Sequence, residues 1–280
     1  QYTKSVEHLQ AFDKRYAHSK LHAEAMLTGL EWSRDLAFEE NSVFFATRYL
    51  KKNPNGSDAR QVRSDLLALY LAKEYYAGAI GILKQSAKYD TSKAKAYAQI
   101  IDLELRYGST QRAARTADEI LRSRNLDPAT QTIALQAKLT HAKQKGNVPA
   151  VRSIGKKLEG IANPTQKTRD AMGEARYYMA EANAKTLNRG FFNLGLKDPM
   201  KTLTNSYQEF RRVRAQFYGV CDVGLNAYCA PAMHTIARAS ESYIRTIEDL
   251  TIQQDLAAAV VDKFTADKQK ILNDVANTSL

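Results

Sequence analysis

Cys221 and Cys229 are the only cysteines of the 280-residue chain, and their spacing could support a covalent link. They are eight positions apart in a stretch with Gly219, Gly224 and Pro231, which predicts a turn between helices. A loop of this kind can bring two Cα atoms to the separation of a disulfide, whereas a single helix cannot. A disulfide here would indicate an oxidising compartment. The alternative is two free buried thiols in a cytosolic protein.

Metal binding has little support in the sequence. A structural zinc site needs four ligands, and only His234 lies near the two cysteines. His18 and His22 are four positions apart with Glu24 close by, a spacing that could hold a metal on one helix face. They straddle a predicted turn, however, and the run HSKLH is not the HExxH pattern. We therefore expect solvated turn histidines, no metal and no cofactor.

Catalytic motifs are also missing from the sequence. It contains no G-x-S-x-G motif, no P-loop and no dinucleotide fingerprint. Carboxylate pairs such as Glu39 and Glu40 are adjacent, so they point to different sides of a helix and are typical of surface charge. We expect that the chain is not an enzyme and has no small-molecule substrate.

Basic and aromatic residues alternate in one stretch, where Arg211, Arg212 and Arg214 lie between Tyr207 and Phe217. Such a combination can bind phosphate and stack on nucleic-acid bases. The same residues can instead pack their stems and rings between helices while the polar ends reach water. We favour this packing interpretation.

The formal net charge of +11 favours acidic partners, which include nucleic acid, an anionic lipid surface and an acidic protein. The lysines and arginines are scattered and seldom form runs, as on an ordinary solvated surface. No run approaches 18 apolar residues, so we expect no transmembrane helix. Position 1 is Gln and no signal peptide is visible, which indicates a removed leader or a piece of a longer chain.

The elements that position these residues are clearest between Ser42 and Leu71. Apolar residues recur close to a 3.6-residue period on both sides of an Asn-Pro-Asn-Gly segment, which predicts two amphipathic helices. Pro54 cannot continue a helix, and Gly56 tolerates a left-handed backbone. Ser57 or Asp58 can cap the second helix. The short connection makes the two helices antiparallel neighbours.

Similar units recur along the chain. The small residues Ala79, Ala114 and Ala150 are roughly 35 positions apart, each followed by aliphatic residues and bounded by polar turns. Small residues let two helices approach closely, and the aliphatic side chains fill the groove between them. Residues 1–20 read as the second helix of such a pair, whose first helix would lie upstream.

These units resemble the tetratricopeptide repeat (TPR) of the bacterial cell-envelope type. The resemblance is carried by the turns at Tyr16–Ala25 and Asn53–Ala59 and by Leu67, Tyr70 and Ala79. It implies an all-α fold, a right-handed superhelical α-solenoid of TPR-like helix hairpins, and the role of a scaffold.

The resemblance covers residues 1–165, which we predict to be TPR-like helical repeats. Residues 166–280 are predicted to form a longer-helix C-terminal capping region that contains the Cys221/Cys229 loop. The helices expected there span residues 168–185, 200–217, 232–254 and 256–276, with a loop over 188–199. Terminal units of repeat arrays are expected to differ from the others.

The resemblance and the cysteine pair together suggest a non-catalytic protein–protein interaction scaffold in the periplasm. Its partners would be other proteins of an envelope assembly for motility, secretion, outer-membrane building or cell-wall synthesis, and it would meet the membrane only through them. The candidate partner-binding residues are Tyr70, Tyr97, Tyr107, Tyr177, Arg211, Arg212 and Arg214. One alternative is a helical accessory region of a cell-wall enzyme. The other is a basic helical-repeat nucleic-acid binder, although no repeating code is apparent.

Overall fold

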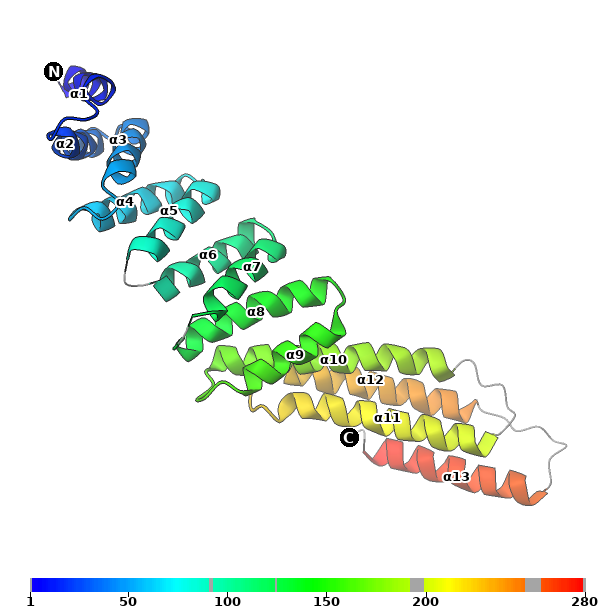
Figure 1. Cartoon of the computed structure of the whole chain (residues 1–280). Coiled ribbons are helices and arrows are strands. Elements are labelled where there is room, and N and C mark those ends of the chain that lie inside the picture. The colour runs from blue at the N-terminus through cyan, green and yellow to red at the C-terminus, as the bar shows by residue number, and fades with distance from the viewer. Residues whose placement is uncertain (1, 91–92, 124, 192–198, 250–257, 279–280) are drawn as a thin grey trace. The chain divides into compact units, whose positions relative to one another are not determined.

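The computed structural model describes the backbone of residues 2–90, 93–123, 125–191, 199–249 and 258–278. All regular secondary structure in these ranges is α-helical, with thirteen helices and no strand (Figure 1). The all-α prediction is therefore confirmed, as is the packing of consecutive helices against one another within each of the two compact units described next.

The chain divides into two compact units, Gln1–Leu126 and Asp127–Leu280. The first unit contains α1 (Tyr2–Arg15), α2 (His22–Asp35), α3 (Glu39–Lys52), α4 (Ala59–Ala72), α5 (Tyr76–Tyr89), α6 (Lys93–Tyr107) and α7 (Thr110–Leu121). The second contains α8 (Pro128–Gln144), α9 (Val148–Glu159), α10 (Gln166–Phe191), α11 (Pro199–Cys221), α12 (Cys229–Glu248) and α13 (Ala258–Asn277).

The predicted hairpin between Ser42 and Leu71 is the pair α3 and α4. The details of its turn differ from the prediction. Gly56 does not adopt a positive φ; instead, a Cβ there would lie 2.5 Å from the Tyr49 hydroxyl, so the glycine makes room for that side chain. Asp58 makes no side-chain capping bond to α4, and its carboxylate accepts a hydrogen bond from the Ser57 hydroxyl at 2.6 Å.

Close approach between consecutive helices organises the core of the first unit. Phe45 of α3 is fully buried, and its ring lies against Gly29 of α2. A Cβ at position 29 would be 2.6 Å from the nearest ring atom, which is closer than atoms pack. The buried apolar residues around this contact are Val6, Met26, Leu30, Ala46, Tyr49, Leu50, Ala59, Val62, Leu66 and Ile82. The two helices therefore pack at a distance that only a glycine permits.

A buried arginine joins three segments of the first unit. Arg63 of α4 is 3% exposed, and its guanidinium donates to the carbonyl of Pro54 at 2.7 Å and to the carboxylate of Asp90 at 3.3 Å. Pro54 lies in the turn before α4, and Asp90 follows α5. A buried charge without partners is costly. The two turns are therefore held where Pro54 and Asp90 can accept hydrogen bonds from Arg63.

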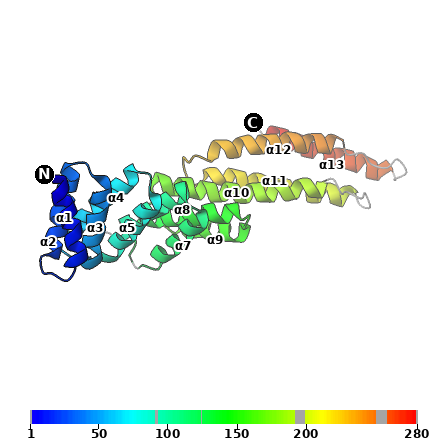
Figure 2. The same ribbon diagram turned by 90° about the horizontal axis from the view of Figure 1, so that it is seen from above.

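The second unit contains the long helices. Helices α10 to α13 lie side by side, with α11 in contact with α10, α12 and α13 (Figures 1 and 2). Their shared core includes Phe210 stacked on Tyr243, with ring centroids 4.4 Å apart, and Phe217 and Phe264. The predicted capping region is thus a bundle of four long helices, which α8 and α9 adjoin through α10.

Several predicted boundaries in this unit require correction. Helix α10 continues to Phe191, so residues 188–191 are helical and not part of a loop; residues 192–198 lie outside the described ranges. Helix α12 ends at Glu248. The predicted end of this helix at residue 254 and the predicted start of the last helix at residue 256 also lie outside the described ranges. The compact units divide at Leu126 and Asp127, so α8 and α9 group with the long helices. The division at residue 165 stays a prediction about repeat type.

Among the residues that the structure describes, no helix is both long and apolar enough to cross a bilayer.

Two glycine substitutions test the close packing of α2 and α3. We expect Gly29→Ala to lower the free energy of unfolding by about 1–3 kcal/mol, because the added methyl overlaps the Phe45 ring. Gly81→Ala on α5 meets no atom within 4 Å, so it should raise that free energy by about 0.5–1 kcal/mol through helix propensity alone. Urea titrations followed by circular dichroism measure both. Equal effects of the two substitutions would contradict the packing described.

Candidate protein-interaction surface

Five tyrosines gather on α4, α5 and α6 of the first unit. We call this set the tyrosine surface; its members are Tyr70, Tyr75, Tyr76, Tyr97 and Tyr107. The rings of Tyr70 and Tyr75 meet edge to face, with centroids 5.1 Å apart. Tyr76 and Tyr107 stack in parallel, with centroids 3.7 Å apart. Tyr75 and Tyr107 are each 54% exposed, so large rings with fixed neighbours face solvent.

The turn between α4 and α5 explains why these rings meet. Glu74 adopts a positive φ of 56°, which reverses the chain at the end of α4. The amide of Tyr75 then donates to the carbonyl of Tyr70 at 2.8 Å. One turn later, Gly78 leaves the space that the two rings fill: a Cβ there would be 2.4 Å from the Tyr75 ring and 2.9 Å from the Tyr70 ring. The glycine therefore allows both rings to approach the backbone of α5 closely.

A rigid core supports the tyrosine surface from below. Ala79 and Leu83 of α5 and Ile100 and Leu103 of α6 are buried, and the side chains of Tyr70, Tyr76 and Tyr97 pack against this cluster. Burial raises the pKa of Tyr97, and the carboxylate of Glu119 raises it further. The tyrosines are thus anchored at one end and open to solvent at the other, the arrangement that aromatic residues take in protein interfaces.

The stacked pair also changes the acidity of one hydroxyl. The hydrogen bond that the Tyr76 hydroxyl donates to Tyr107, followed by desolvation, raises the pKa of Tyr76 from 10.0 to about 12. The Tyr76 hydroxyl is therefore neutral at physiological pH.

Three of the four predicted tyrosines, Tyr70, Tyr97 and Tyr107, belong to this surface. Tyr177 lies in the second unit, where it is half-buried against Phe217 and its hydroxyl is 3.0 Å from that of Thr235. The contact of any of these residues with a partner stays a prediction. Tyr75 and Tyr76 were not among the predicted binding residues. Their pairing with Tyr70 and Tyr107 depends on how the helices pack, which the local sequence does not show.

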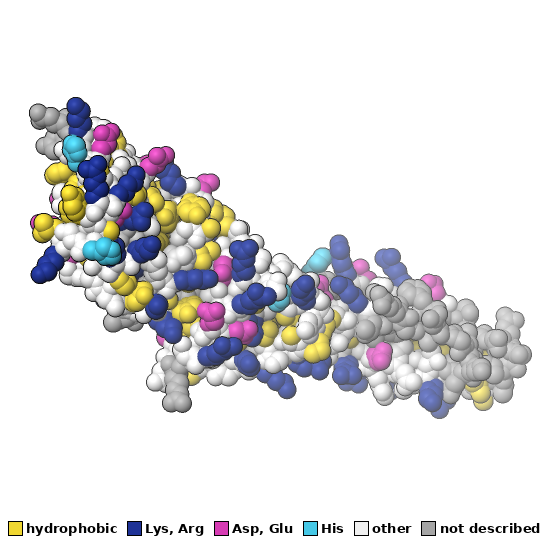
Figure 3. Space-filling model, turned by 45° about the horizontal axis from the view of Figure 1, so that its top comes forward, with side chains coloured by type: hydrophobic (Ala, Val, Ile, Leu, Met, Phe, Trp, Pro, Cys, Tyr) yellow, Lys and Arg dark blue, Asp and Glu magenta, His cyan; other side chains and the backbone are white. Residues whose placement is uncertain are grey.

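The predicted arginines on α11 lie in three different settings. Arg214 stacks on Phe210 at 5.8 Å and approaches Asp274 of α13 at 3.9 Å, so its stem packs between helices. Arg211 lies over the ring of Tyr207 at 5.7 Å. Arg212 is exposed. On the face seen in Figure 3, Lys and Arg side chains are spread out and do not form one continuous patch.

The first unit also contains a hollow between α2, α3 and α4, with a volume of about 480 Å³. Its lining includes the apolar residues Leu30, Ala46 and Leu66. The charged residues at its edge are paired, as in the 2.7 Å contact between Arg34 and Asp65. The hollow therefore offers apolar surface but no unpaired charge that would select a ligand.

The predicted solvated histidines require a correction. His18 is exposed as expected, but His22 is 3% exposed and its Nε2 lies 2.8 Å from the Asp13 carboxylate. Arg48 of α3 approaches the same carboxylate at 3.2 Å, so Asp13 links three helices. His22 is thus a structural residue. Among the residues that the structure describes, no three His, Cys, Asp or Glu side chains could hold a metal ion together.

The cysteine pair lies at the corner between α11 and α12. Cys221 ends one helix and Cys229 begins the next; their Cα atoms are 4.9 Å apart and their sulfur atoms 2.04 Å apart, the geometry of a disulfide. The loop between them is also held by α10, because Gln166 donates to the carbonyl of Leu225 at 2.9 Å. This corner is therefore fixed at several points.

Comparisons with known proteins do not assign the chain to a family. No protein-family model matches the chain, and no curated protein matches it. Among solved structures, it is similar to a tetratricopeptide repeat protein from Parabacteroides merdae, with 9% identity and a TM-score of 0.32 over 96% of this chain and 92% of that one. The described residues form consecutive packed helices of the all-α class. The function proposed below rests on its own side chains.

The raised pKa of Tyr76 can be tested by substitution. In protein labelled with ¹³C at the tyrosine Cζ, we expect the Tyr76 signal to titrate near pH 12, and Tyr107→Phe to move its pKa toward 10.0, because the hydroxyl that raises it is lost. Stability is affected in the same range: the unfolded phenol ionises first, so the contribution of Tyr76 is complete below pH 10 and is lost between pH 10 and 12.

Tyr75→Phe is the matched control for this titration. Tyr75 is adjacent in sequence but pairs with Tyr70, so its substitution should leave the pKa of Tyr76 unchanged. The stacked pair is contradicted by a Tyr76 pKa near 10 in the unsubstituted protein, or by equal shifts in the two variants.

Proposed function

We propose that this protein is a non-catalytic protein–protein interaction scaffold and that its tyrosine surface contacts a partner protein. The observation that carries this proposal is the pair Tyr75 and Tyr107, each 54% exposed although its ring lies against another tyrosine ring. The exposed parts of these rings add apolar area that a partner protein could cover, and aromatic residues are enriched in protein interfaces.

The energetics of tyrosine support this role. A tyrosine has few rotatable bonds, so it loses little conformational entropy when a partner covers it. Here Gly78 and the stacking of Tyr76 on Tyr107 already limit the ring positions, so part of that entropy is lost before binding. The hydroxyl groups can donate to and accept from the partner's main chain. A protein surface with apolar side chains and accessible backbone groups is therefore the partner that fits.

We place this scaffold in the periplasm, within a larger bacterial envelope assembly for motility, secretion, outer-membrane building or cell-wall synthesis. Two observations support the location: the disulfide geometry of Cys221 and Cys229, and the resemblance of the Tyr16–Ala25 and Asn53–Ala59 turns to envelope repeat proteins. Disulfides persist in oxidising compartments, to which the periplasm belongs.

Substitutions in the tyrosine surface test the proposed role. We expect Tyr75→Ala and Tyr107→Ala to reduce recovery of the partner from the native source more than about tenfold, because exposed aromatic anchors contribute about 2 kcal/mol or more each. Quantitative mass spectrometry of proteins copurifying with the full chain measures the effect.

Tyr16→Ala is the matched control, since Tyr16 is 57% exposed in the same unit but lies outside the tyrosine surface. It should retain the partner. Gly78→Ala should lose it, because the added methyl displaces the Tyr75 ring, whereas Gly81→Ala should not. Retention of the same partner by Tyr75→Ala, Tyr107→Ala and Gly78→Ala would refute the proposal.

The compartment can be tested by counting thiols. Protein isolated from the native source, denatured without reductant and treated with a maleimide should show no free thiol, because both cysteines are joined. After reduction, the free energy of unfolding should fall by about 2–3 kcal/mol, since a short constrained loop is released. Two thiols that react before reduction would place the chain in a reducing compartment.

A further inference from the structure

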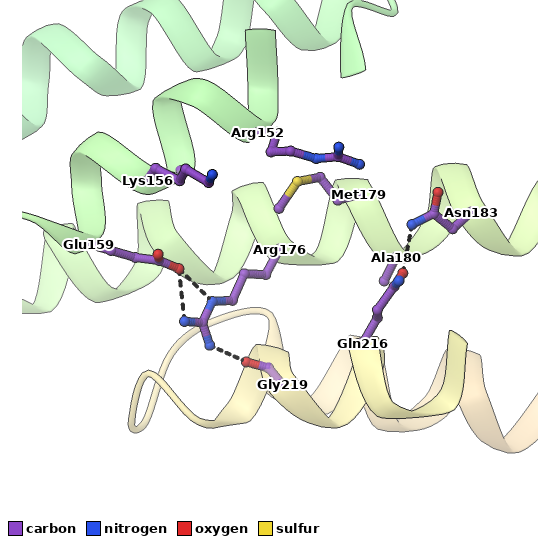
Figure 4. A pocket seen from close by; sticks show the side chains of 10 residues that line it. Arg152, Lys156, Glu159, Arg176, Met179, Ala180, Asn183, Gln216 and Gly219 are labelled. Carbon is purple, nitrogen blue, oxygen red and sulfur yellow. Dashed lines mark hydrogen bonds and ion pairs between the residues drawn. The ribbon is translucent and has the colours of Figure 1, made fainter. Parts of the chain in front are cut away.

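The second unit contains a hollow that the tyrosine surface does not explain. It has a volume of about 340 Å³ and lies where α9, α10 and α11 meet (Figure 4). Its lining consists of Arg152, Gly155, Lys156, Glu159, Arg176, Met179, Ala180, Asn183, Gln216 and Gly219. The volume is within the range of about 300–1,000 Å³ that is common for ligand sites.

One side of this hollow is a fixed network. The guanidinium of Arg176 donates twice to the carboxylate of Glu159, at 3.0 and 2.8 Å, and once to the carbonyl of Gly219, at 2.6 Å. At the other end, Asn183 donates to Gln216 at 2.7 Å. Figure 4 shows these contacts joining α10 to α9 and α11. The three helices are therefore linked around the hollow before any ligand enters.

The other side carries charge that this network does not balance. Arg152 and Lys156 are four positions apart on α9, so they lie on the same helix face, and both are exposed. Neither forms an ion pair with a carboxylate of the described residues. Glu159 is the single acidic residue among the ten described lining residues, and Arg176 already engages it. Three cations against one carboxylate leave the hollow with an excess of two positive charges.

The positive character continues along α11. Arg212 precedes Gln216 by four positions, so it projects from the same side of α11 one helical turn away. Arg211 and Arg214 lie over aromatic rings, whereas no such ring contact is found for the exposed Arg212 among the described residues. Of the three predicted arginines, it is the one positioned to extend this site.

We propose that this hollow binds the carboxylates of an acidic segment of a protein partner. Arg152 and Lys156 supply the charge, and guanidinium and ammonium groups are the usual partners of carboxylates. Met179, which is partly exposed, lines the hollow and offers an apolar contact for the methylene groups of a glutamate side chain. No aromatic residue is among the described residues that line the hollow, so it lacks the platform on which nucleic-acid bases stack.

This site lies in a different unit from the tyrosine surface and is independent of it. A failure of the tyrosine substitutions to release a partner leaves the acidic-segment site untouched, and the converse also holds.

Two adjacent lysines allow a matched test. The probe is a fluorescein-labelled peptide of four Gly-Glu repeats. Its binding to the full chain is followed by fluorescence anisotropy at about 0.15 M ionic strength, where exposed charges more than about 8 Å apart are largely screened. Lys156→Glu should weaken binding at least about fivefold, because an attraction becomes a repulsion. Lys157→Glu makes the same charge change, at an exposed position in the same last turn of α9 but outside the hollow. It should change binding less than about twofold.

The matched pair also controls for folding, because both lysines lie at the same end of α9 and interact alike with its dipole. Arg152→Glu should reproduce the loss seen with Lys156→Glu. Equal losses for Lys156→Glu and Lys157→Glu would mean attraction to net charge alone and would overturn the proposal. Absence of peptide binding would overturn it as well, as would tighter, Lys156-dependent binding of a single-stranded oligothymidine of equal charge.

Discussion

The close approach of consecutive helices is the constraint on which the rest of this structure depends. In the first unit, a glycine at position 29 lets the Phe45 ring lie against the backbone of α2. Ala79 on α5 and Ala113 and Ala117 on α7 are likewise fully buried. Since each helix packs mainly on its neighbours in sequence, the core is built from many short-range contacts and not from one central cluster.

The same constraint accounts for the tyrosine surface. Small and aliphatic residues of α5 and α6, such as Ala79 and Ile100, form the buried cluster here, and several tyrosine rings pack against it. Tyr75 and Tyr107 lie outside the core, held by their partner rings and by the space above Gly78. A surface of rigid aromatic rings is thus a direct result of how the helices pack.

The second unit uses its helices differently. Four long helices share a core that includes stacked aromatic rings, and the junction of α9, α10 and α11 is held by polar contacts around Arg176. A network of this kind keeps a hollow open, because Arg176 is bound by Glu159 and Gly219 and does not fold into the space. The two units therefore offer surfaces of different chemistry, one aromatic and neutral, the other basic.

The sequence predicted those features that depend on neighbouring residues. Helical periodicity and the Asn-Pro-Asn-Gly segment were sufficient for the α3–α4 hairpin, and the spacing of Cys221 and Cys229 was sufficient for a corner of disulfide geometry. Gly56, which tolerates a left-handed backbone, does not adopt a positive φ and instead leaves space for the Tyr49 side chain of the preceding helix.

Features that depend on other helices could not be predicted in this way. The burial of His22 requires Asp13 on α1, which also contacts Arg48 on α3. The pairing of Tyr76 requires Tyr107 at the end of α6, and the acidic-segment site requires three helices to meet. Local patterns carry no information about which distant side chains become neighbours.

The central claim, that the tyrosine surface is where a partner binds, is tested most directly by photo-crosslinking in the native host. The photoreactive residue p-benzoylphenylalanine replaces Tyr107 in one full-length variant and Tyr16 in another. We predict a discrete adduct with a single protein from position 107 and none of that size from position 16. The absence of an adduct at 107, or the same adducts from both positions, would contradict the claim.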